Sequence, residues 1–138
     1  MIERGYNEMR ILIAEDDFAS RKFMDKYLSQ YGDCDATVDG EEAVNAYLMA
    51  LEDEEPYELV CLDVMMPIMN GYQVLEEIRK DEAERGVAKE ERVKIIMTTA
   101  LSGERMVDKA QKLECEAFAG KPIDVEEFDG ILKNLGLI

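Results

Sequence analysis

The stretch LVCLDVMMPIMNG, residues 59–71, joins a short apolar run to a single carboxylate and then to a turn. Leu59–Leu62 has the length and composition of a buried strand, and Asp63 closes it. Pro67 and the Asn70-Gly71 pair are typical of a turn. An acid at the end of a buried strand needs an explanation, because ionised carboxylates are seldom buried without a partner.

Length and composition indicate one globular domain. The chain has 138 residues, of which 47% are hydrophobic, and a chain of this size buries roughly two-thirds of the surface that its unfolded form exposes. Its 32 acidic and 16 basic side chains give a formal net charge of -16. Such a charge opposes binding to polyphosphate backbones, so we expect no nucleic-acid partner. We interpret most of the acids, including those of the run Lys80–Arg85, as solvated surface.

We expect the protein in the cytoplasm, with no membrane partner. The N-terminus lacks the basic and apolar regions of a signal peptide, and no apolar run approaches the roughly 18 residues of a membrane span. Cys34, Cys61 and Cys115 are odd in number and widely spaced, which favours neither disulfides nor a zinc site. We interpret Cys61 and Cys115 as small core residues in a reducing compartment.

Short β-rich runs alternate with longer stretches of helical periodicity. Five strands are expected, at Arg10–Ala14, Ala36–Val38, Leu59–Leu62, Val93–Met97 and Ala117–Ala119. This alternation predicts βαβ units. It therefore predicts an α/β fold with a doubly wound, five-stranded parallel sheet and helices on both faces.

Each intervening helix is expected to bury one apolar stripe. Gly32 should stop the first helix, a charged loop beginning at Lys80 should end the third, and the fourth should lie near Glu104–Leu113. Asp124 is expected at the start of the last helix. The predicted stripes are Phe23, Met24, Tyr27, Leu28 and Tyr31; Val44, Tyr47, Leu48 and Leu51; Val74, Leu75 and Ile78; Met106, Val107 and Ala110; and Phe128, Ile131, Leu132 and Leu135.

Polar residues follow four of the five strands. Glu15–Asp17 comes after the first, Asp63 after the third, Thr98 and Thr99 after the fourth, and Lys121 after the fifth. Parallel strands bring their carboxyl ends to one edge of the sheet, where ligands of such folds bind, so we expect these side chains to meet. Taken singly, each has a structural explanation as a helix start, a turn, a cap or an exposed charge. Their joint occurrence at strand ends favours a site.

The predicted cluster suits Mg²⁺ and phosphoryl chemistry. Carboxylate oxygens with no His or Cys among them are the ligands that Mg²⁺ prefers. A lysine and a hydroxyl beside such an ion can neutralise a phosphoryl group during its transfer. Asp63 is the candidate nucleophile, because aspartate can accept a phosphoryl group as an acyl phosphate.

Four motifs in register resemble the receiver domains of two-component response regulators, in particular the stand-alone chemotaxis type. They are ILIAEDD with Arg21 four residues on, LDVMMPIMNG, IIMTTA and FAGKP. The resemblance extends from about Met9 to Ile138 and leaves residues 1–8 as an N-terminal extension. It implies a flavodoxin-like sheet of strand order 2-1-3-4-5 with five helices. It also implies that the chain is not an enzyme, beyond catalysing its own phosphorylation and dephosphorylation.

The resemblance assigns roles to the acidic residues. Asp63 matches the phosphoacceptor, which takes the phosphoryl group from the phosphohistidine of a sensor kinase. Glu15 and Asp16 match the acidic pair that holds Mg²⁺, with Asp16 as a direct ligand and Glu15 acting through water. The backbone carbonyl of Met65 is expected to supply another oxygen to the ion.

The resemblance also implies a conformational switch. Lys121 matches the lysine that contacts the phosphoryl oxygen, and the peptide before Pro122 is expected to be cis. Composition does not separate Thr98 from Thr99, whose side chains should point to opposite faces of the strand, but the family register selects Thr99 as the switch hydroxyl. Phe118 matches the aromatic that moves inward when the hydroxyl is drawn toward phosphate. The alternative for Phe118 is a core aromatic that never moves.

The implied partners are a sensor histidine kinase or histidine phosphotransferase, and a target protein that docks on the fourth helix, fifth strand and fifth helix. Because the sequence ends after the last predicted helix, we expect output by protein docking or onward phosphotransfer from a single-domain regulator. An alternative is a receiver module cut from a larger hybrid kinase.

Two further alternatives come from other functional classes. One is a Mg²⁺-dependent phosphatase or hydrolase with an Asp nucleophile, although such enzymes usually carry an acid two residues later, where this chain has Met65. The other is a binding module for an anionic small molecule, but the first turn is acidic and lacks a glycine-rich phosphate loop.

Three positions depart from the family pattern. Glu15 replaces the commoner Asp, which leaves its role as a ligand open. Asn70 stands where Asp is frequent before Gly, which changes the charge of a turn. Met65 is apolar, and we hypothesise that it fails to orient attacking water and so lengthens the phosphorylated lifetime.

Overall fold

The computed structural model describes residues 9–100 and 114–138, so the predicted N-terminal extension and the helix expected near Glu104–Leu113 lie outside the described residues. One parallel sheet has the strand order β2-β1-β3-β4-β5, which confirms the predicted flavodoxin-like fold. The strands are β1 (Met9–Ala14), β2 (Gly32–Thr37), β3 (Leu59–Asp63), β4 (Lys94–Thr99) and β5 (Ala117–Gly120). The helices are α1 (Phe18–Leu28), α2 (Gly40–Glu52), α3 (Gly71–Arg85), α5 (Val125–Asn134) and the short 3-10 helix η1 (Lys89–Glu91).

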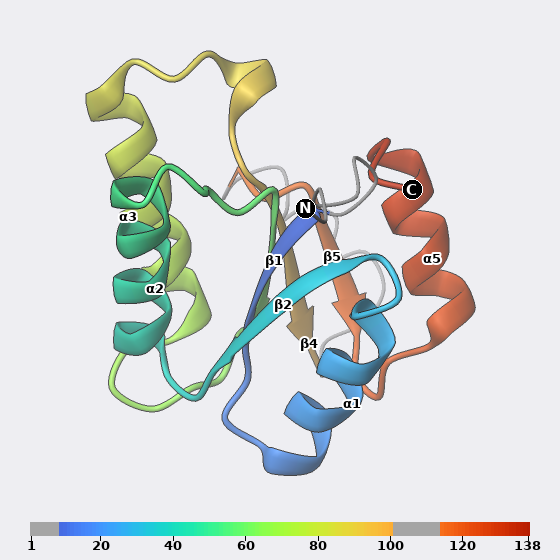
Figure 1. The fold of residues 1–138 in the computed structure, drawn as a ribbon. Helices are drawn as coiled ribbons and strands as arrows, with labels where there is room; N and C mark the ends of the chain where they lie inside the picture. Colours follow the sequence, from blue (N-terminus) through green and yellow to red (C-terminus); the bar gives the residue numbers. More distant parts are fainter. Residues whose placement is uncertain (1–8, 101–113) are drawn as a thin grey trace, which may run out of the picture.

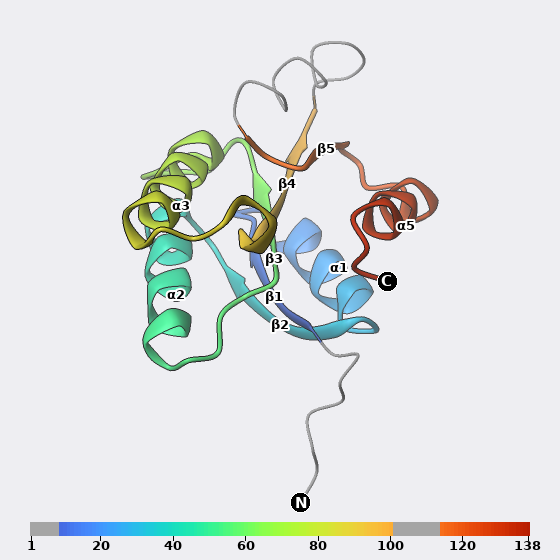
Figure 2. The same ribbon diagram turned by 90° about the horizontal axis from the view of Figure 1, so that it is seen from above.

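Helices cover both faces of the sheet. Figures 1 and 2 show α2 and α3 on one face and α1 and α5 on the other. Alternate residues of each strand therefore enter different cores: Leu12 and Leu62 pack under α2 and α3, whereas Ile13 and Cys61 pack under α1 and α5. Strands covered on both faces read as continuous apolar runs, which is why the central strands were readily predicted.

Gly32 has a different role from the one predicted. Helix α1 ends at Leu28, and Gly32 begins β2, which starts four residues earlier than the predicted Ala36. A Cβ atom at position 32 would lie 2.1 Å from the carbonyl oxygen of Met9. Glycine is required here because β1 and β2 approach closely, and not because a helix needs a stop signal.

The apolar face predicted for α2 was partly wrong. Ala43, Tyr47 and Ala50 are the buried side chains of this helix, whereas Leu48 is 39% exposed. The small alanines let α2 lie close to the sheet, and the Tyr47 hydroxyl donates a hydrogen bond of 2.9 Å to Asp81 of α3. Alanine is only weakly hydrophobic, so a hydrophobic pattern follows the larger residues instead. The buried face of α2 is therefore rotated about the helix axis relative to the predicted one.

The charged run after Lys80 was also misinterpreted, because α3 continues through it to Arg85 and one of its acids is buried. Glu82 is only 3% exposed. The Arg79 guanidinium donates to Glu82 at 2.6 Å and to Glu116 at 2.9 Å, and the second oxygen of Glu82 accepts from the Val93 N–H at 2.8 Å. These bonds compensate the buried charges and join α3 to the segments that enter β4 and β5.

Other core predictions are confirmed in part. Phe23 was wrongly placed in the buried stripe of α1: it is 45% exposed and stacks on Tyr27 from the solvent side of the helix. The predicted stripe of Met106, Val107 and Ala110 lies outside the described residues.

Cys61 and Cys115 are buried, and all three cysteines are free. Phe128 and Leu132 of α5 are fully buried, and Asp124 caps this helix by accepting from the Glu126 and Glu127 N–H groups. Within residues 9–100 and 114–138, no helix combines the length and the apolar character needed to cross a bilayer.

Candidate functional site

The carboxyl ends of the strands bring together residues that are far apart in the sequence. All strands run toward the lower edge of the sheet in Figure 1. Glu15 directly follows β1, Asp63 is the last residue of β3 and pairs with Thr98 of β4, and Lys121 directly follows β5. The predicted convergence of strand-end polar residues is therefore present in the structure.

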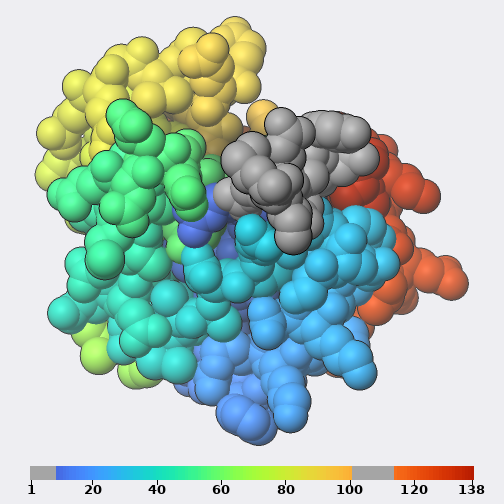
Figure 3. All heavy atoms as spheres, in the orientation of Figure 1, coloured from blue at the N-terminus to red at the C-terminus, as the bar shows by residue number. Residues whose placement is uncertain are grey.

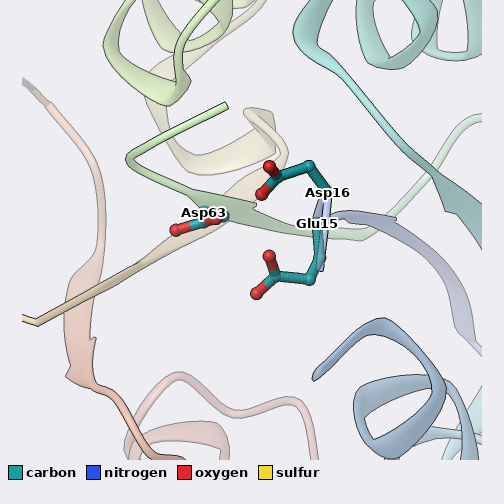
Figure 4. Close-up of side chains that lie close together, drawn as sticks. All are labelled: Glu15, Asp16 and Asp63. Carbon is teal, nitrogen blue, oxygen red and sulfur yellow. The ribbon is translucent and has the colours of Figure 1, made fainter. Parts of the chain in front are cut away.

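Three carboxyl groups gather at this edge (Figure 4). One carboxylate oxygen from each of Glu15, Asp16 and Asp63 lies within 4.8 Å of the others. Glu15 and Asp63 are 4% and 5% exposed, whereas Asp16 is open to solvent. Carboxylate oxygens at this separation, with one of them accessible, are suited to a hard divalent cation.

Lys121 provides a fixed positive charge beside these acids. Its Nζ lies 2.7 Å from Glu15 Oε1 and 3.4 Å from Asp63 Oδ1. Burial lowers the pKa of Lys121, but its hydrogen bond with Glu15 and the charges of Glu15 and Asp63 outweigh this effect, so the pKa is raised. The side chain therefore stays an ammonium group. The Lys121-Pro122 peptide is cis, as the resemblance implied.

The same surroundings disfavour ionisation of Asp63. Burial, followed by the hydrogen bond and the charge of Glu15, raises the pKa of Asp63 to about 7. Lys121 and the backbone N–H of Met65, 3.4 Å from Asp63 Oδ1, act in the opposite direction without cancelling the shift. Near neutral pH the carboxyl group is therefore partly protonated, and binding of a cation should release this proton.

The three acids of the turn between β1 and α1 have two different roles: one caps α1, and two lie near Asp63. The Glu15 N–H donates to the carbonyl of Thr37 at 3.1 Å, which continues the pairing of β1 with β2. Asp17 accepts from the Ser20 N–H at 2.9 Å and caps α1. Of the run Glu15–Asp17, the helix-start explanation thus holds for Asp17, and the other two acids face Asp63.

Arg21 donates hydrogen bonds to the β1–α1 turn, and these bonds were not predicted from the sequence. Its Nη1 donates to the carbonyl oxygen of Glu15 at 2.9 Å and to that of Asp16 at 3.2 Å. The sequence feature that could have indicated such a contact is a cationic residue in the first turn of a helix that follows an acidic run. The sequence did not show that the cation would bind backbone carbonyls instead of carboxylates.

The turn in LVCLDVMMPIMNG holds α3 against the acceptor strand. Asn70 and Gln73 form a reciprocal capping box at the start of α3, so Asn70 is a cap as well as a turn residue. A Cβ atom at Gly71 would lie 2.4 Å from the Asp63 carbonyl oxygen. Only glycine allows this approach without a backbone shift. Met65 is 77% exposed.

The two threonines lie on opposite faces of the sheet. Thr98 lines a cavity of about 270 Å³, together with Phe23, Lys121 and Ile123, on the side of α1 and α5. Alternation along β4 places Thr99 on the other face, with Met97. Phe118 is buried on that face, in the same core as Met97. The structure thus separates Thr98 from Thr99 and puts Thr99 and Phe118 on one side.

The sequence matches the response regulator receiver domain over residues 11–133. The chain belongs to the response regulator receiver domain family. This receiver domain is a module of two-component signalling, and receiver domains are signalling modules and not classical enzymes.

Relatives of this receiver domain include larger proteins. It is 35% identical over 127 residues to the probable transcriptional regulator ycf27 of Guillardia theta, covering 90% of this chain and 44% of that protein. It is 31% identical over 145 residues to the probable histidine kinase 2 of Oryza sativa subsp. indica, covering 95% of this chain and 14% of that protein. The chain spans about half or less of the length of several curated relatives that it matches, these two among them.

A solved structure supports the fold directly. The receiver domain of the histidine kinase CKI1 from Arabidopsis thaliana, in a mutant form, superimposes with a TM-score of 0.79. The two are 25% identical, and the match covers 96% of this chain and 91% of that one.

The raised pKa of Asp63 predicts that Asp63→Asn stabilises the metal-free protein at alkaline pH. Between pH about 4 and 7 the native state holds a proton that the unfolded chain has lost, so this group makes stability fall as pH rises through that window. The carboxamide of the variant has no charge to desolvate. The gain in unfolding free energy should be near zero at pH 4 and about 1–2 kcal/mol at pH 8.

Urea denaturation of both proteins in chelator, from pH 4 to 8, measures this gain. A difference that is the same at every pH would show that ionisation of Asp63 carries no cost in the fold.

Proposed function

We propose that Asp63 accepts a phosphoryl group from the phosphohistidine of a sensor histidine kinase or histidine phosphotransferase, in a Mg²⁺-dependent reaction in the cytoplasm, and that the phosphorylated domain signals by docking to a protein. The observation that carries this proposal is the buried Asp63 carboxyl group, which lies beside two further carboxylates and the Lys121 ammonium. The three free cysteines agree with a reducing compartment. The proposal concerns the receiver module and holds whether the module acts alone or within a longer protein.

The side chains at the site fit Mg²⁺. Its ligands would be the carboxylates of Glu15, Asp16 and Asp63 and the backbone carbonyl of Met65, all of them hard oxygen donors. When bound, the ion supplies positive charge to the phosphoryl oxygens during transfer. Glu15 Oε1 already contacts Lys121, and Oε2 accepts from the Asp17 N–H at 3.2 Å. These contacts favour Asp16 as the direct ligand and Glu15 as a ligand through water.

The proposed transfer step uses the ionised form of Asp63. One carboxylate oxygen attacks the phosphorus atom, the N–P bond of the phosphohistidine breaks, and its electron pair returns to the imidazole. The product is an acyl phosphate on Asp63. Lys121, held beside Asp63 by its pairing with Glu15, then contacts a phosphoryl oxygen.

We propose Thr99 and Phe118 as the switch that reads this product. Both lie on the face of the sheet that α3 covers, and Phe118 is buried there. Attraction of the Thr99 hydroxyl to the phosphoryl group would hold Phe118 inward and shift an existing equilibrium. The docking surface affected would be formed by residues 104–113, β5 and α5. Residues 104–113 lie outside the described residues.

Phosphorylation of Asp63 can be tested by intact-mass analysis after treatment with acetyl phosphate. The wild-type protein should gain a single phosphoryl adduct in the presence of Mg²⁺ and almost none in chelator. Asp63→Asn should gain none, whereas Asp39→Asn, which alters an acid at the start of α2, should behave as the wild type. An adduct that survives in Asp63→Asn would contradict the assignment.

The same preparation distinguishes the hydrolase alternative. A phosphatase would release phosphate from p-nitrophenyl phosphate over many turnovers, whereas a receiver domain should show stoichiometric labelling only. Sustained turnover that requires Asp63 would favour the hydrolase.

The apolar side chain at position 65 predicts slow loss of the phosphoryl group. A carboxamide two residues after the acceptor can orient an attacking water molecule, so Met65→Asn should shorten the phosphorylated half-life several-fold. Met49→Asn is the matched control, because Met49 is 61% exposed on α2 and should leave the half-life unchanged. Equal half-lives for the wild type and Met65→Asn would refute the role of Met65.

The switch assignment predicts different effects for the two threonines. Thr99→Ala should still be phosphorylated, but the ring resonances of Phe118 should no longer respond to phosphorylation. Thr98→Ala removes the neighbouring hydroxyl on the opposite face and should keep the response. A Phe118 signal that never changes in the wild type would favour the core-aromatic alternative.

A further inference from the structure

The β1–α1 turn is held from the helix side by one guanidinium group. Arg21 Nη1 donates to the carbonyls of two consecutive residues, Glu15 at 2.9 Å and Asp16 at 3.2 Å. One nitrogen therefore fixes the orientation of two adjacent peptide planes. Because backbone orientation sets the direction of each Cα–Cβ bond, it also sets the directions in which the two carboxylates leave the chain.

Helix geometry explains why position 21 can reach this turn. Arg21 is the fourth residue of α1, and its backbone N–H donates to the Asp17 carbonyl at 2.9 Å. Side chains of a helix tilt toward its N-terminus, so the guanidinium folds back over residues 15–17. The guanidinium carbon lies 5.6 Å from the centre of the Phe18 ring, a cation–π contact that helps to hold the side chain in place. The blue segment that contains this turn lies at the lower surface of the molecule in Figure 3.

We propose that Arg21 is a positioning residue for the cation site: it holds Glu15 and Asp16 in the orientation in which their carboxylates converge with that of Asp63. The inference rests on the metal site of the proposed function. Arg21 itself contacts neither the cation nor the phosphoryl group in this proposal. Its effect passes through the two carbonyl bonds.

Two effects of Arg21 on cation binding oppose each other. Its positive charge repels a divalent ion nearby, so removing it would tighten binding if electrostatics dominated. Its hydrogen bonds order the ligand-bearing turn, so removing them should weaken binding if positioning dominates. Groups that orient metal ligands typically contribute about 10-fold or more to affinity, whereas a solvent-screened charge contributes less. Positioning should therefore dominate.

The chain offers a matched control one residue away. Lys22 carries the same charge, is exposed, and lies 5.8 Å from the same Phe18 ring, but its contact in the structure is with this ring and not with the turn. Isothermal titration of Mg²⁺ at pH 8 would compare wild type, Arg21→Gln and Lys22→Gln. Arg21→Gln should weaken Mg²⁺ binding about 10-fold, and Lys22→Gln should leave it equal or slightly tighter.

Thermal unfolding in chelator separates positioning from a general loss of structure. Arg21→Gln should unfold close to the wild-type temperature without metal, and its Mg²⁺-induced stabilisation should be smaller. Arg21→Lys, which can reach one carbonyl, should recover part of the affinity. Tighter binding by both glutamine variants, or unchanged binding by Arg21→Gln, would overturn the inference. A wild type that does not bind Mg²⁺ would instead contradict the metal site of the proposed function.

Discussion

The site depends on one ammonium group that contacts two members of a cluster of three carboxylates. Lys121 lies 2.7 Å from Glu15 and 3.4 Å from Asp63, and Asp16 adds a third acid within 4.8 Å of both. A single positive charge does not balance this cluster, which is why burial and Glu15 can raise the pKa of Asp63 to about 7. The remaining imbalance is the physical reason for expecting a divalent cation at this edge of the sheet.

The other buried ionic cluster of the described residues is balanced differently. Around Arg79, the carboxylates of Glu82 and Glu116 each accept a backbone N–H as well as the guanidinium. Its donors and acceptors are thus satisfied within the protein, and the cluster joins elements at the amino ends of β4 and β5. At the carboxyl ends of the strands the three acids lie close to one another, and Asp16 is exposed to solvent. The first arrangement holds the fold together, and the second is suited to a ligand.

The sequence correctly predicted the features that follow from strand direction. The predictions were wrong where side-chain size or a buried ion pair determines which residues are buried. The apolar strands and their polar ends fixed the positions of Asp63 and Lys121, because parallel strands leave little freedom at their carboxyl edge. Glu82 was interpreted as solvated because its partner Arg79 precedes the charged run in which it lies. Leu48 was predicted to be buried because it is more hydrophobic than the neighbouring alanines. In the structure Ala43 and Ala50 face the sheet instead, because their small side chains let α2 lie close to it. Neither outcome can be derived from hydrophobic periodicity alone.

The length of the side chain at position 15 explains why a glutamate serves where aspartate is commoner. Glu15 is anchored at its backbone by Thr37 and through Arg21, so its reach toward Lys121 depends on the side chain alone. An aspartate is shorter by one methylene, and it would have to give up either the 2.7 Å contact with Lys121 or the bond from the Asp17 N–H. Glutamate keeps both, and in doing so it raises the pKa of Lys121 and of Asp63 together. The longer acid therefore helps to keep the lysine charged, and its negative charge adds to the burial that disfavours ionisation of Asp63.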